Sequence, residues 1–361
     1  MDDGKFEHGG NIYQAARLTG KTPELDFSAN INPLGLSDKV RRAIADNIAQ
    51  VVHYPDPAAF ELREAISLHY GVRPDALALG NGAAELIYLL CHVLRPARVF
   101  LPVPSFSEYE RAALAVGARV EYFYLEAGDC FKINLEKLAC ALPPGALAFI
   151  GNPDNPAGNL LAQSGLRDFL ALARAKGCFI AIDESFIDFL PQPDESTLRH
   201  FCAEYDNMAV IHSLTKFFAI PGLRLGFGVF SSALALRLQG AADRWNVNSL
   251  AQAAGKAALS DKAYITESRA LVARLRENLT AALSAFPAIK VFPSSANFLL
   301  LDIRNTGLTA KRLSERLAGR GVLVRDCGNY PGLDGGYVRI AVRGQEENEK
   351  LITILGEFIG R

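Results

Sequence analysis

Short runs of apolar residues without polar alternation recur along the first two thirds of the chain. Between several of them the apolar positions change to a spacing of three or four residues, which is typical of helices with one covered face. Runs without polar alternation indicate strands buried on both faces, as in a parallel or mixed sheet between helices. The pattern therefore predicts an α/β fold with a large, doubly wound mixed-sheet domain. The expected strands span residues 98–103, 119–125, 146–151, 178–184, 208–213 and 225–230, and the expected helices span 83–94, 107–117 and 166–177.

The pattern changes near Trp245. A long helical stretch follows at about 249–286, and then short apolar runs alternate with helices near 310–320 and from 346 onward. This order predicts a smaller α+β domain. We expect a large domain over residues 41–244, a small domain over 245–361, and an N-terminal segment, 1–40, that packs on the small domain.

Composition narrows the class of protein. The chain has 361 residues, of which 50% are hydrophobic, so two domains with sizeable cores are expected. A net charge of −1 gives no basic surface for a nucleic acid. The polar start carries no apolar signal segment, and the longest early apolar run, 86–94, is too short to cross a bilayer. The six scattered cysteines show no zinc spacing. We therefore expect a cytoplasmic protein with no metal site, nucleic acid or membrane partner.

Polar motifs follow several of the predicted strands, where ligands of open α/β sheets bind. GNGAAELI (80–87) places glycines directly before a helix, whose free N–H groups favour phosphate. NPDNPAGN (152–159) makes a stiff turn that could aim the Asn155 amide at a ligand. In AIDESFIDF (181–189), Asp183 ends an apolar strand, so its carboxylate needs a cationic or proton-bearing partner. Each motif alone also fits an ordinary structural turn.

The stretch HSLTKFFAIPGLRLGFG (212–228) holds a lone lysine, Lys216, between Ser213 and Arg224. A lysine in a partly apolar pocket has a lowered pKa and becomes a usable amine nucleophile, able to form a Schiff base. Ser213 and Arg224 could hold an anion beside it. The plain alternative is a surface lysine whose stem lies along the protein.

These motifs in this order resemble the fold type I pyridoxal-phosphate enzymes, the aspartate aminotransferase group, over nearly the full chain. The resemblance implies a pyridoxal 5'-phosphate cofactor, with Lys216 as the Schiff-base lysine and Asp183 as the carboxylate that pairs with the pyridine N–H. It also implies a set of residues around the cofactor phosphate: Gly82, Ala83, Ala84, Ser213 and Arg224.

The same resemblance implies roles for four other residues. Asn155 would contact the phenolic oxygen, Phe106 would stack on the ring, and Arg339 would bind the substrate α-carboxylate. Tyr54 would reach the cofactor phosphate of a neighbouring subunit, so a homodimer is expected. One position departs from the family pattern, because Phe186 stands where many members have a tyrosine that bonds to the phenolic oxygen.

The N-terminal segment favours one branch of this family. HGGNIYQAARLTG (8–20), LDFSANINPLGLS (25–37) and NYPGLDGGYVRIAVR (329–343) resemble the threonine-phosphate decarboxylases of cobalamin biosynthesis. That resemblance implies decarboxylation of L-threonine O-3-phosphate to (R)-1-amino-2-propanol O-2-phosphate. The implied substrate-binding residues are His8, Gly9, Asn30, Asn155, Arg325 and Arg339.

Three alternatives stay open. Histidinol-phosphate aminotransferases share the middle motifs but lack the HGGN opening, and a serine-phosphate decarboxylase would differ by one substrate methyl group. The third is a ligand sensor, in which this fold is fused to a DNA-binding module; no such module is recognisable here, and the net charge is near zero.

Overall fold

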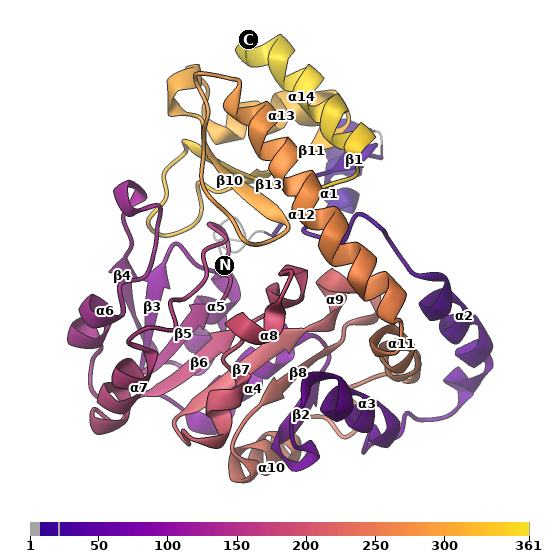
Figure 1. Ribbon diagram of the computed structural model, residues 1–361, viewed down its shortest axis with the longest axis vertical. Coiled ribbons are helices and arrows are strands. Elements are labelled where there is room, and N and C mark those ends of the chain that lie inside the picture. Colours follow the sequence, from indigo (N-terminus) through magenta and orange to yellow (C-terminus); the bar gives the residue numbers. More distant parts are fainter. Residues whose placement is uncertain (1–7, 21, 361) are drawn as a thin grey trace.

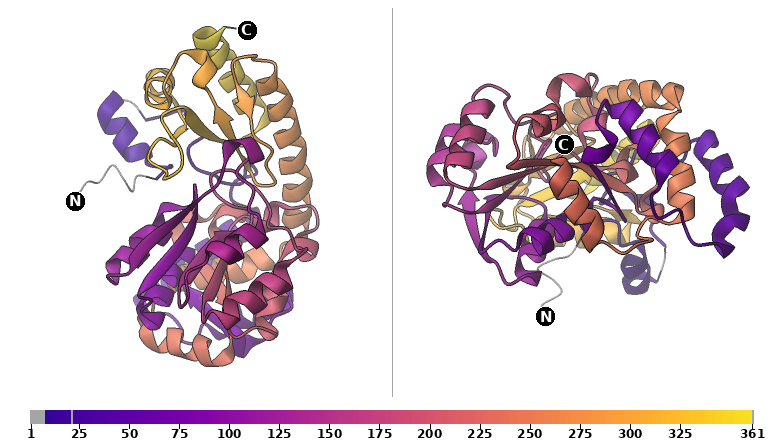
Figure 2. Two further views of the ribbon diagram at one scale, coloured as in Figure 1. Left: turned by 90° about the vertical axis from the view of Figure 1, so that its left-hand side faces the viewer. Right: turned by 90° about the horizontal axis from the view of Figure 1, so that it is seen from below.

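The computed structural model describes residues 8–20 and 22–360, so the part of the N-terminal prediction that concerns residues 1–7 lies outside it. The chain forms two lobes, one above the other (Figures 1 and 2). No helix in the described ranges combines the length and apolar character needed to span a membrane.

The large lobe is built on a seven-stranded mixed sheet of order β2-β8-β7-β6-β5-β3-β4, in which β8 runs antiparallel to both of its neighbours. The six predicted strands are confirmed. The seventh, β2, was missed because its four residues run directly into the GNG turn. The strands are β2 (Leu77–Gly80), β3 (Arg98–Val103), β4 (Arg119–Tyr124), β5 (Leu147–Gly151), β6 (Phe179–Asp183), β7 (Met208–Ser213) and β8 (Gly226–Val229).

Each face of this sheet has its own hydrophobic core, because successive side chains of a strand point to opposite faces. On β6, for example, Ile180 and Ile182 belong to one core and Ala181 belongs to the other. Helices α4 (Ala83–Leu94), α5 (Ser107–Ala115) and α10 (Ser232–Ala241) cover the Ala181 face. The opposite face is covered by α3 (Phe60–Tyr70), α6 (Leu135–Ala141), α7 (Leu166–Ala175) and α11 (Ser249–Leu259), with α2 (Asp38–Asn47) beside them.

The small lobe holds an antiparallel sheet of order β12-β13-β10-β9 and a separate parallel pair, β1-β11. Its strands are β1 (Leu25–Asp26), β9 (Lys290–Val291), β10 (Phe298–Asp302), β11 (Val322–Leu323), β12 (Arg325–Asp326) and β13 (Tyr337–Ala341). Its helices are α12 (Lys262–Ser284), α13 (Ala310–Gly319) and α14 (Gln345–Ile359), and α1 (Ile12–Thr19) lies against α13 (Figure 2).

The division between the lobes differs from the predicted boundary at residue 245. Helix α11 packs on α2 and α3, and α12 contributes Val272 to the large-lobe core but Leu275 to the small-lobe core. The chain therefore passes from the large lobe to the small lobe within one continuous helix. The spacing of apolar residues cannot reveal this boundary, because the helical pattern continues across it. The N-terminal segment is also divided, since Phe27 lies in the small-lobe core and Val40 in the large-lobe core.

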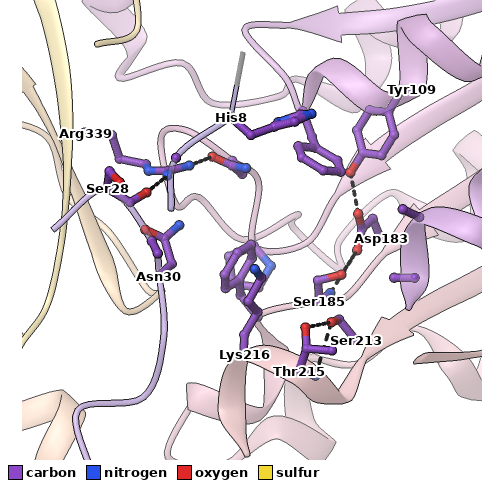
Figure 3. Close-up of a pocket in the computed structure, with 18 of the residues that line it drawn as sticks. His8, Ser28, Asn30, Tyr109, Asp183, Ser185, Ser213, Thr215, Lys216 and Arg339 are labelled. Carbon is purple, nitrogen blue, oxygen red and sulfur yellow. Dashed lines mark hydrogen bonds between the residues drawn. The ribbon is translucent and has the colours of Figure 1, made fainter. Parts of the chain in front are cut away.

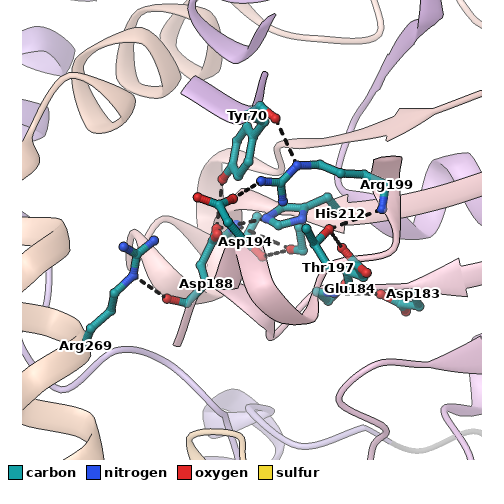
Figure 4. A network of polar contacts seen from close by, with 12 residues as sticks. Tyr70, Asp183, Glu184, Asp188, Asp194, Thr197, Arg199, His212 and Arg269 are labelled. Atoms are coloured by element: carbon teal, nitrogen blue, oxygen red, sulfur yellow. Dashed lines mark hydrogen bonds and ion pairs between the residues drawn. The ribbon is translucent and has the colours of Figure 1, made fainter. Parts of the chain in front are cut away.

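A buried polar network stabilises the segment that follows β6 (Figure 4). The Asp188 carboxylate accepts a hydrogen bond from the Tyr70 hydroxyl at 2.8 Å and pairs with His212 Nε2 at 2.8 Å. Glu184 accepts hydrogen bonds from Thr197 and from the Leu198 backbone, both at 2.6 Å. These contacts fix the chain on both sides of the turn that begins at Asp183, at the end of β6.

The pKa of Asp188 follows from this network. Burial alone would raise it, but the neighbouring His212 ring and the hydrogen bonds from His212 and Tyr70 outweigh burial and lower it to about 2. An unfolded aspartate titrates near a pKa of about 4. The stabilisation from Asp188 is therefore fully present above pH 4 and is lost as the pH falls from about 4 towards 2.

Replacing Asp188 by Asn should therefore lower the free energy of unfolding at pH 7 by on the order of 2 kcal/mol. The difference from wild type should shrink as the pH falls from 4 towards 2, as measured by urea unfolding. Asp206→Asn is the control, because Asp206 pairs with Arg174 at an exposed site and should change stability by less than about 0.5 kcal/mol. A difference for Asp188→Asn that is the same at pH 7 and at pH 2.5 would contradict this account.

Candidate active site

A pocket lies between the lobes, at the carboxyl ends of β6 and β7 (Figure 3). It is lined by the N-terminal segment, by the large lobe and by Arg339 of β13 in the small lobe. It brings together twelve of the residues predicted from sequence: His8, Gly9, Asn30, Ala83, Ala84, Phe106, Asn155, Asp183, Ser213, Lys216, Arg224 and Arg339. Motifs more than 300 residues apart in the chain thus share one cavity.

Lys216 lies in the short helix α9 (Leu214–Phe217), directly after β7, and its side chain points into the pocket. The pKa of its amine is lowered to about 8, first by burial and then by the charges of Arg224 and Arg339, while Asp183 acts in the opposite direction. An amine with this pKa is about half neutral at pH 8, and the neutral form can act as a nucleophile. The backbone carbonyl of Lys216 accepts a hydrogen bond from the Asn32 N–H at 3.1 Å, which holds the helix in place.

Asp183 ends β6, and both of its carboxylate oxygens are oriented by neighbours. One accepts a hydrogen bond from the Tyr109 hydroxyl at 2.7 Å, and the other accepts bonds from the hydroxyl and backbone N–H of Ser185. Tyr109 stacks on Phe149, with a distance of 5.1 Å between ring centroids. Burial and the nearby Asp183 raise the pKa of Tyr109 well above its usual value, so its hydroxyl keeps its proton.

The residues predicted around a phosphate gather at the N-terminus of α4. Ala83 and Ala84 start this helix, where free N–H groups and the helix dipole favour an anion. Gly82 precedes them with a φ of +82°, and a Cβ atom at Gly82 would lie 2.2 Å from the Arg224 guanidinium. Gly82 is not among the residues that line the pocket, but its missing side chain lets Arg224 approach the helix. Thr215, which the sequence reasoning missed, is 2.8 Å from the Ser213 hydroxyl and lines the same corner.

Arg339 connects the two lobes across the pocket. Its guanidinium donates to Asn155 Oδ1 at 2.6 Å, in the large lobe, and to the backbone carbonyl of Ser28 at 2.8 Å. Its buried Nε atom and the buried Oδ1 atom of Asn30 have no hydrogen-bond partner among the described residues. Unpaired buried polar atoms are costly, so both atoms are available to a polar ligand.

The two phenylalanines in the pocket occupy different walls. Phe106 lies 5.5 Å from the His8 ring and meets Tyr109 edge-on, while Phe186 packs edge-on against Phe298. Phe186 offers no hydroxyl to a ligand, and the side-chain amides that line the pocket belong to Asn155 and Asn30.

Besides Gly82, two predicted site residues lie outside the lining. The Arg325 guanidinium lies 5.2 Å from the centre of the Tyr330 ring and donates to Asn329 Oδ1 at 2.7 Å. Tyr330 lines the pocket, whereas Arg325 is not among the lining residues, so a role of Arg325 at the substrate phosphate stays a prediction. Tyr54 is exposed and stacks on Trp245, away from the pocket of its own chain. Neither arrangement follows from sequence spacing, because each depends on how distant segments pack.

The chain belongs to the aminotransferase class I and II family, whose model matches residues 22–355. It is 36% identical over 351 residues to a threonine-phosphate decarboxylase from Salmonella typhimurium, with 96% of this chain and 95% of the relative covered. Its structure resembles a histidinol-phosphate aminotransferase from Clostridium acetobutylicum, with a TM-score of 0.86, 32% identity and coverage of 92% of this chain and 98% of the other. It also resembles an L-threonine-O-3-phosphate decarboxylase from Porphyromonas gingivalis, with a TM-score of 0.81, 26% identity and coverage of 93% and 100%.

Family membership confirms the predicted fold and makes the chain a pyridoxal-phosphate enzyme. The residues of the pocket fit that cofactor. Lys216 supplies an amine of lowered pKa, Asp183 supplies an oriented carboxylate, and the start of α4 with Arg224 supplies a cradle for phosphate. The described residues contain no cluster of three or more side chains that could hold a metal ion.

The cradle can be tested at Gly82. In Gly82→Ala the new methyl group would displace Arg224, so we expect the dissociation constant of pyridoxal phosphate to rise roughly tenfold, as for one lost charge-assisted contact. Gly165→Ala is a matched control, because Gly165 also has a positive φ, of +76°, but a Cβ atom added there would have no other atom within 4 Å. Titration of the apoenzyme with cofactor measures both. Equal cofactor affinities in the two variants would show that Arg224 does not form the cradle.

Proposed function

We propose that this member of the family decarboxylates L-threonine O-3-phosphate to (R)-1-amino-2-propanol O-2-phosphate and carbon dioxide, a step of cobalamin biosynthesis. The observation that carries the proposal is the position of the HGGN segment. His8 and Gly9 line the same pocket as Lys216, so an N-terminal imidazole faces the space beyond the amine. The similarity to the Salmonella typhimurium threonine-phosphate decarboxylase supports the same choice.

Pyridoxal phosphate, when bound, supplies an electron sink for whichever bond to the substrate Cα stands perpendicular to its ring. The protein supplies the proton chemistry around it. Asp183, with its oxygens fixed by Tyr109 and Ser185, would hold a proton on the ring nitrogen. Lys216, with a pKa of about 8, can take up and return a proton at Cα near neutral pH.

The substrate phosphate would select the bond. We assign His8 as its principal ligand, with Gly9 and Asn30 beside it and Arg339 near the α-carboxylate. Arg325, whose guanidinium lies 5.2 Å from the centre of the Tyr330 ring, would attract the phosphate through its charge. Binding energy from this distal group would hold the substrate so that the carboxylate, rather than the Cα hydrogen, stands perpendicular to the ring.

A second candidate is histidinol-phosphate amino transfer, favoured by the TM-score of 0.86 to the Clostridium acetobutylicum aminotransferase. That reaction would also use the Lys216 amine and a phosphate ligand, but it would break the Cα–H bond. Serine phosphate is a third substrate to consider, since one methyl group changes binding by only about 1–3 kcal/mol.

The assay is carbon dioxide release from threonine phosphate and serine phosphate, run beside ketoacid-dependent amino transfer from histidinol phosphate. We expect carbon dioxide from threonine phosphate. In His8→Ala, the threonine-phosphate concentration at half-saturation should rise by roughly tenfold or more, as for a lost contact worth about 1.5–3 kcal/mol, with cofactor affinity unchanged. Amino transfer from histidinol phosphate without carbon dioxide release would replace the decarboxylase by the second candidate.

The proposal includes a homodimer. Several large apolar side chains are exposed around Tyr54, and exposed apolar clusters mark interaction surfaces. They include Val51, Val52, Phe60 and Trp245. Tyr54 does not line the pocket of its own chain. Its hydroxyl would therefore reach a cofactor phosphate only in the pocket of a second copy of the chain.

Sedimentation should give the mass of a dimer. In Tyr54→Phe the dimer should persist, because the ring still stacks on Trp245, while the dissociation constant of the cofactor should rise roughly tenfold through one lost phosphate contact. Trp245→Ala should instead weaken the dimer. A fully active monomer, or wild-type cofactor affinity in Tyr54→Phe, would rule out this role.

A further inference from the structure

Glu108 contacts the N-terminal segment at His8, one of the residues that line the pocket. It lies in the first turn of α5, and its carboxylate Oε1 is 2.6 Å from His8 Nε2, although the two residues are 100 positions apart. Glu108 does not itself line the pocket, whereas His8 does. The contact therefore connects a side chain of the large lobe to the proposed phosphate ligand.

The Glu108 carboxylate is held in one orientation. Its other oxygen, Oε2, accepts a hydrogen bond from the Tyr88 hydroxyl of α4 at 2.9 Å, and Arg111 lies 3.6 Å from Oε1. The side chain is only 10% exposed. A carboxylate this deeply buried needs charged or proton-donating partners. Of its contacts with His8, Tyr88 and Arg111, the one with the His8 imidazole is the shortest.

The contact also determines what His8 can offer to a ligand. With Nε2 donating its hydrogen to the Glu108 carboxylate, Nδ1 is the ring atom left for the pocket, and in the imidazolium form of His8 it carries the second N–H, which can be donated to a phosphate oxygen. The backbone that follows is fixed as well. The Gly10 N–H donates to the Ser28 hydroxyl at 2.7 Å, and a Cβ atom at Gly9 would lie 2.0 Å from the Ser28 carbonyl oxygen, so this backbone packs directly on Ser28.

We propose that Glu108 is the positioning residue of the active site: it holds the N-terminal segment across the pocket and orients the His8 ring so that Nδ1 faces the phosphate of the substrate. Glu108 acts through His8 and touches neither substrate nor cofactor. The assignment rests on the proposed function, because it takes His8 as a phosphate ligand.

The competing explanation is that Glu108 only joins α4 to α5 through Tyr88. Two substitutions separate these roles. Glu108→Gln keeps an oxygen that can accept the Nε2 hydrogen, whereas Glu108→Ala removes it. Glu110→Ala is the control, because Glu110 is also buried on α5 but bonds to Tyr122, and residues two apart on a helix point to different sides.

The first measurement is hydrogen–deuterium exchange of the Gly10 amide in the holoenzyme without substrate. We expect exchange to be at least about tenfold faster in Glu108→Ala than in wild type, and close to wild type in Glu108→Gln and Glu110→Ala. Faster exchange in Glu110→Ala as well would mean that α5 is disturbed as a whole. That result, or unchanged exchange in Glu108→Ala, would overturn the proposal.

The second measurement is a double-mutant cycle on steady-state kinetics. Glu108→Ala should raise the threonine-phosphate concentration at half-saturation roughly tenfold while kcat changes by less than about threefold, and it should add nothing in a His8→Ala background. Additive effects of the two substitutions would show that Glu108 does not act through His8.

The positioning role of Glu108 can be tested separately from the proposed decarboxylase function. If the wild-type enzyme releases no carbon dioxide from threonine phosphate, the same cycle is measured as binding of inorganic phosphate to the holoenzyme. Coupling between Glu108 and His8 in that binding would support the positioning role without the decarboxylase, and its absence would overturn the role itself.

Discussion

Lys216 places an amine at the end of β7 with two arginines and one carboxylate around it, and much of the structure follows from the need to accommodate that group. Burial and the positive charges of Arg224 and Arg339 favour the neutral amine, while Asp183 favours the charged form. Each of these neighbours comes from a different segment. The lysine therefore keeps its lowered pKa only if the large sheet, the turn after β7 and the small lobe are all in place.

The closure of the pocket depends on polar contacts that cross between the lobes. Arg339 of β13 donates both to Asn155, in the large lobe, and to the Ser28 carbonyl, in the N-terminal segment. Ser28 in turn accepts a hydrogen bond from the Gly10 N–H, and His8 pairs with Glu108. The N-terminal segment is thus bonded to both lobes. Helix α12 also joins the two lobes, because it contributes side chains to both hydrophobic cores.

The sequence predicted what local rules govern. Apolar runs without polar alternation identified six strands of the large sheet, and glycine, proline and charged residues at their ends predicted most of the residues that line the pocket between the lobes. It could not predict contacts between segments that meet only in the fold. Tyr109 bonds to Asp183 across 74 positions, and Arg325 lies against Tyr330, because helix and strand packing decide these neighbours. The lobe boundary was misplaced for a related reason, since apolar spacing continues through α12 while its packing partners change.

The same separation explains how one fold can serve two reactions. Lys216 and Asp183, which we propose to bind the cofactor and move protons, are positioned by the large sheet, by the Tyr109–Asp183 contact and by the Asn32 N–H that bonds to the Lys216 carbonyl. None of these contacts involves His8 or Gly9. The groups that face the far end of the substrate come from a short stretch that reaches the pocket through a few polar contacts. His8 and Gly9 lie on the wall of the cavity and not within the packed cores of either lobe, so under the proposed function this stretch could change and redirect the reaction without disturbing the core. Under the proposed function, the choice between decarboxylation and amino transfer would therefore be made where packing energy is least involved, by the position of the substrate phosphate.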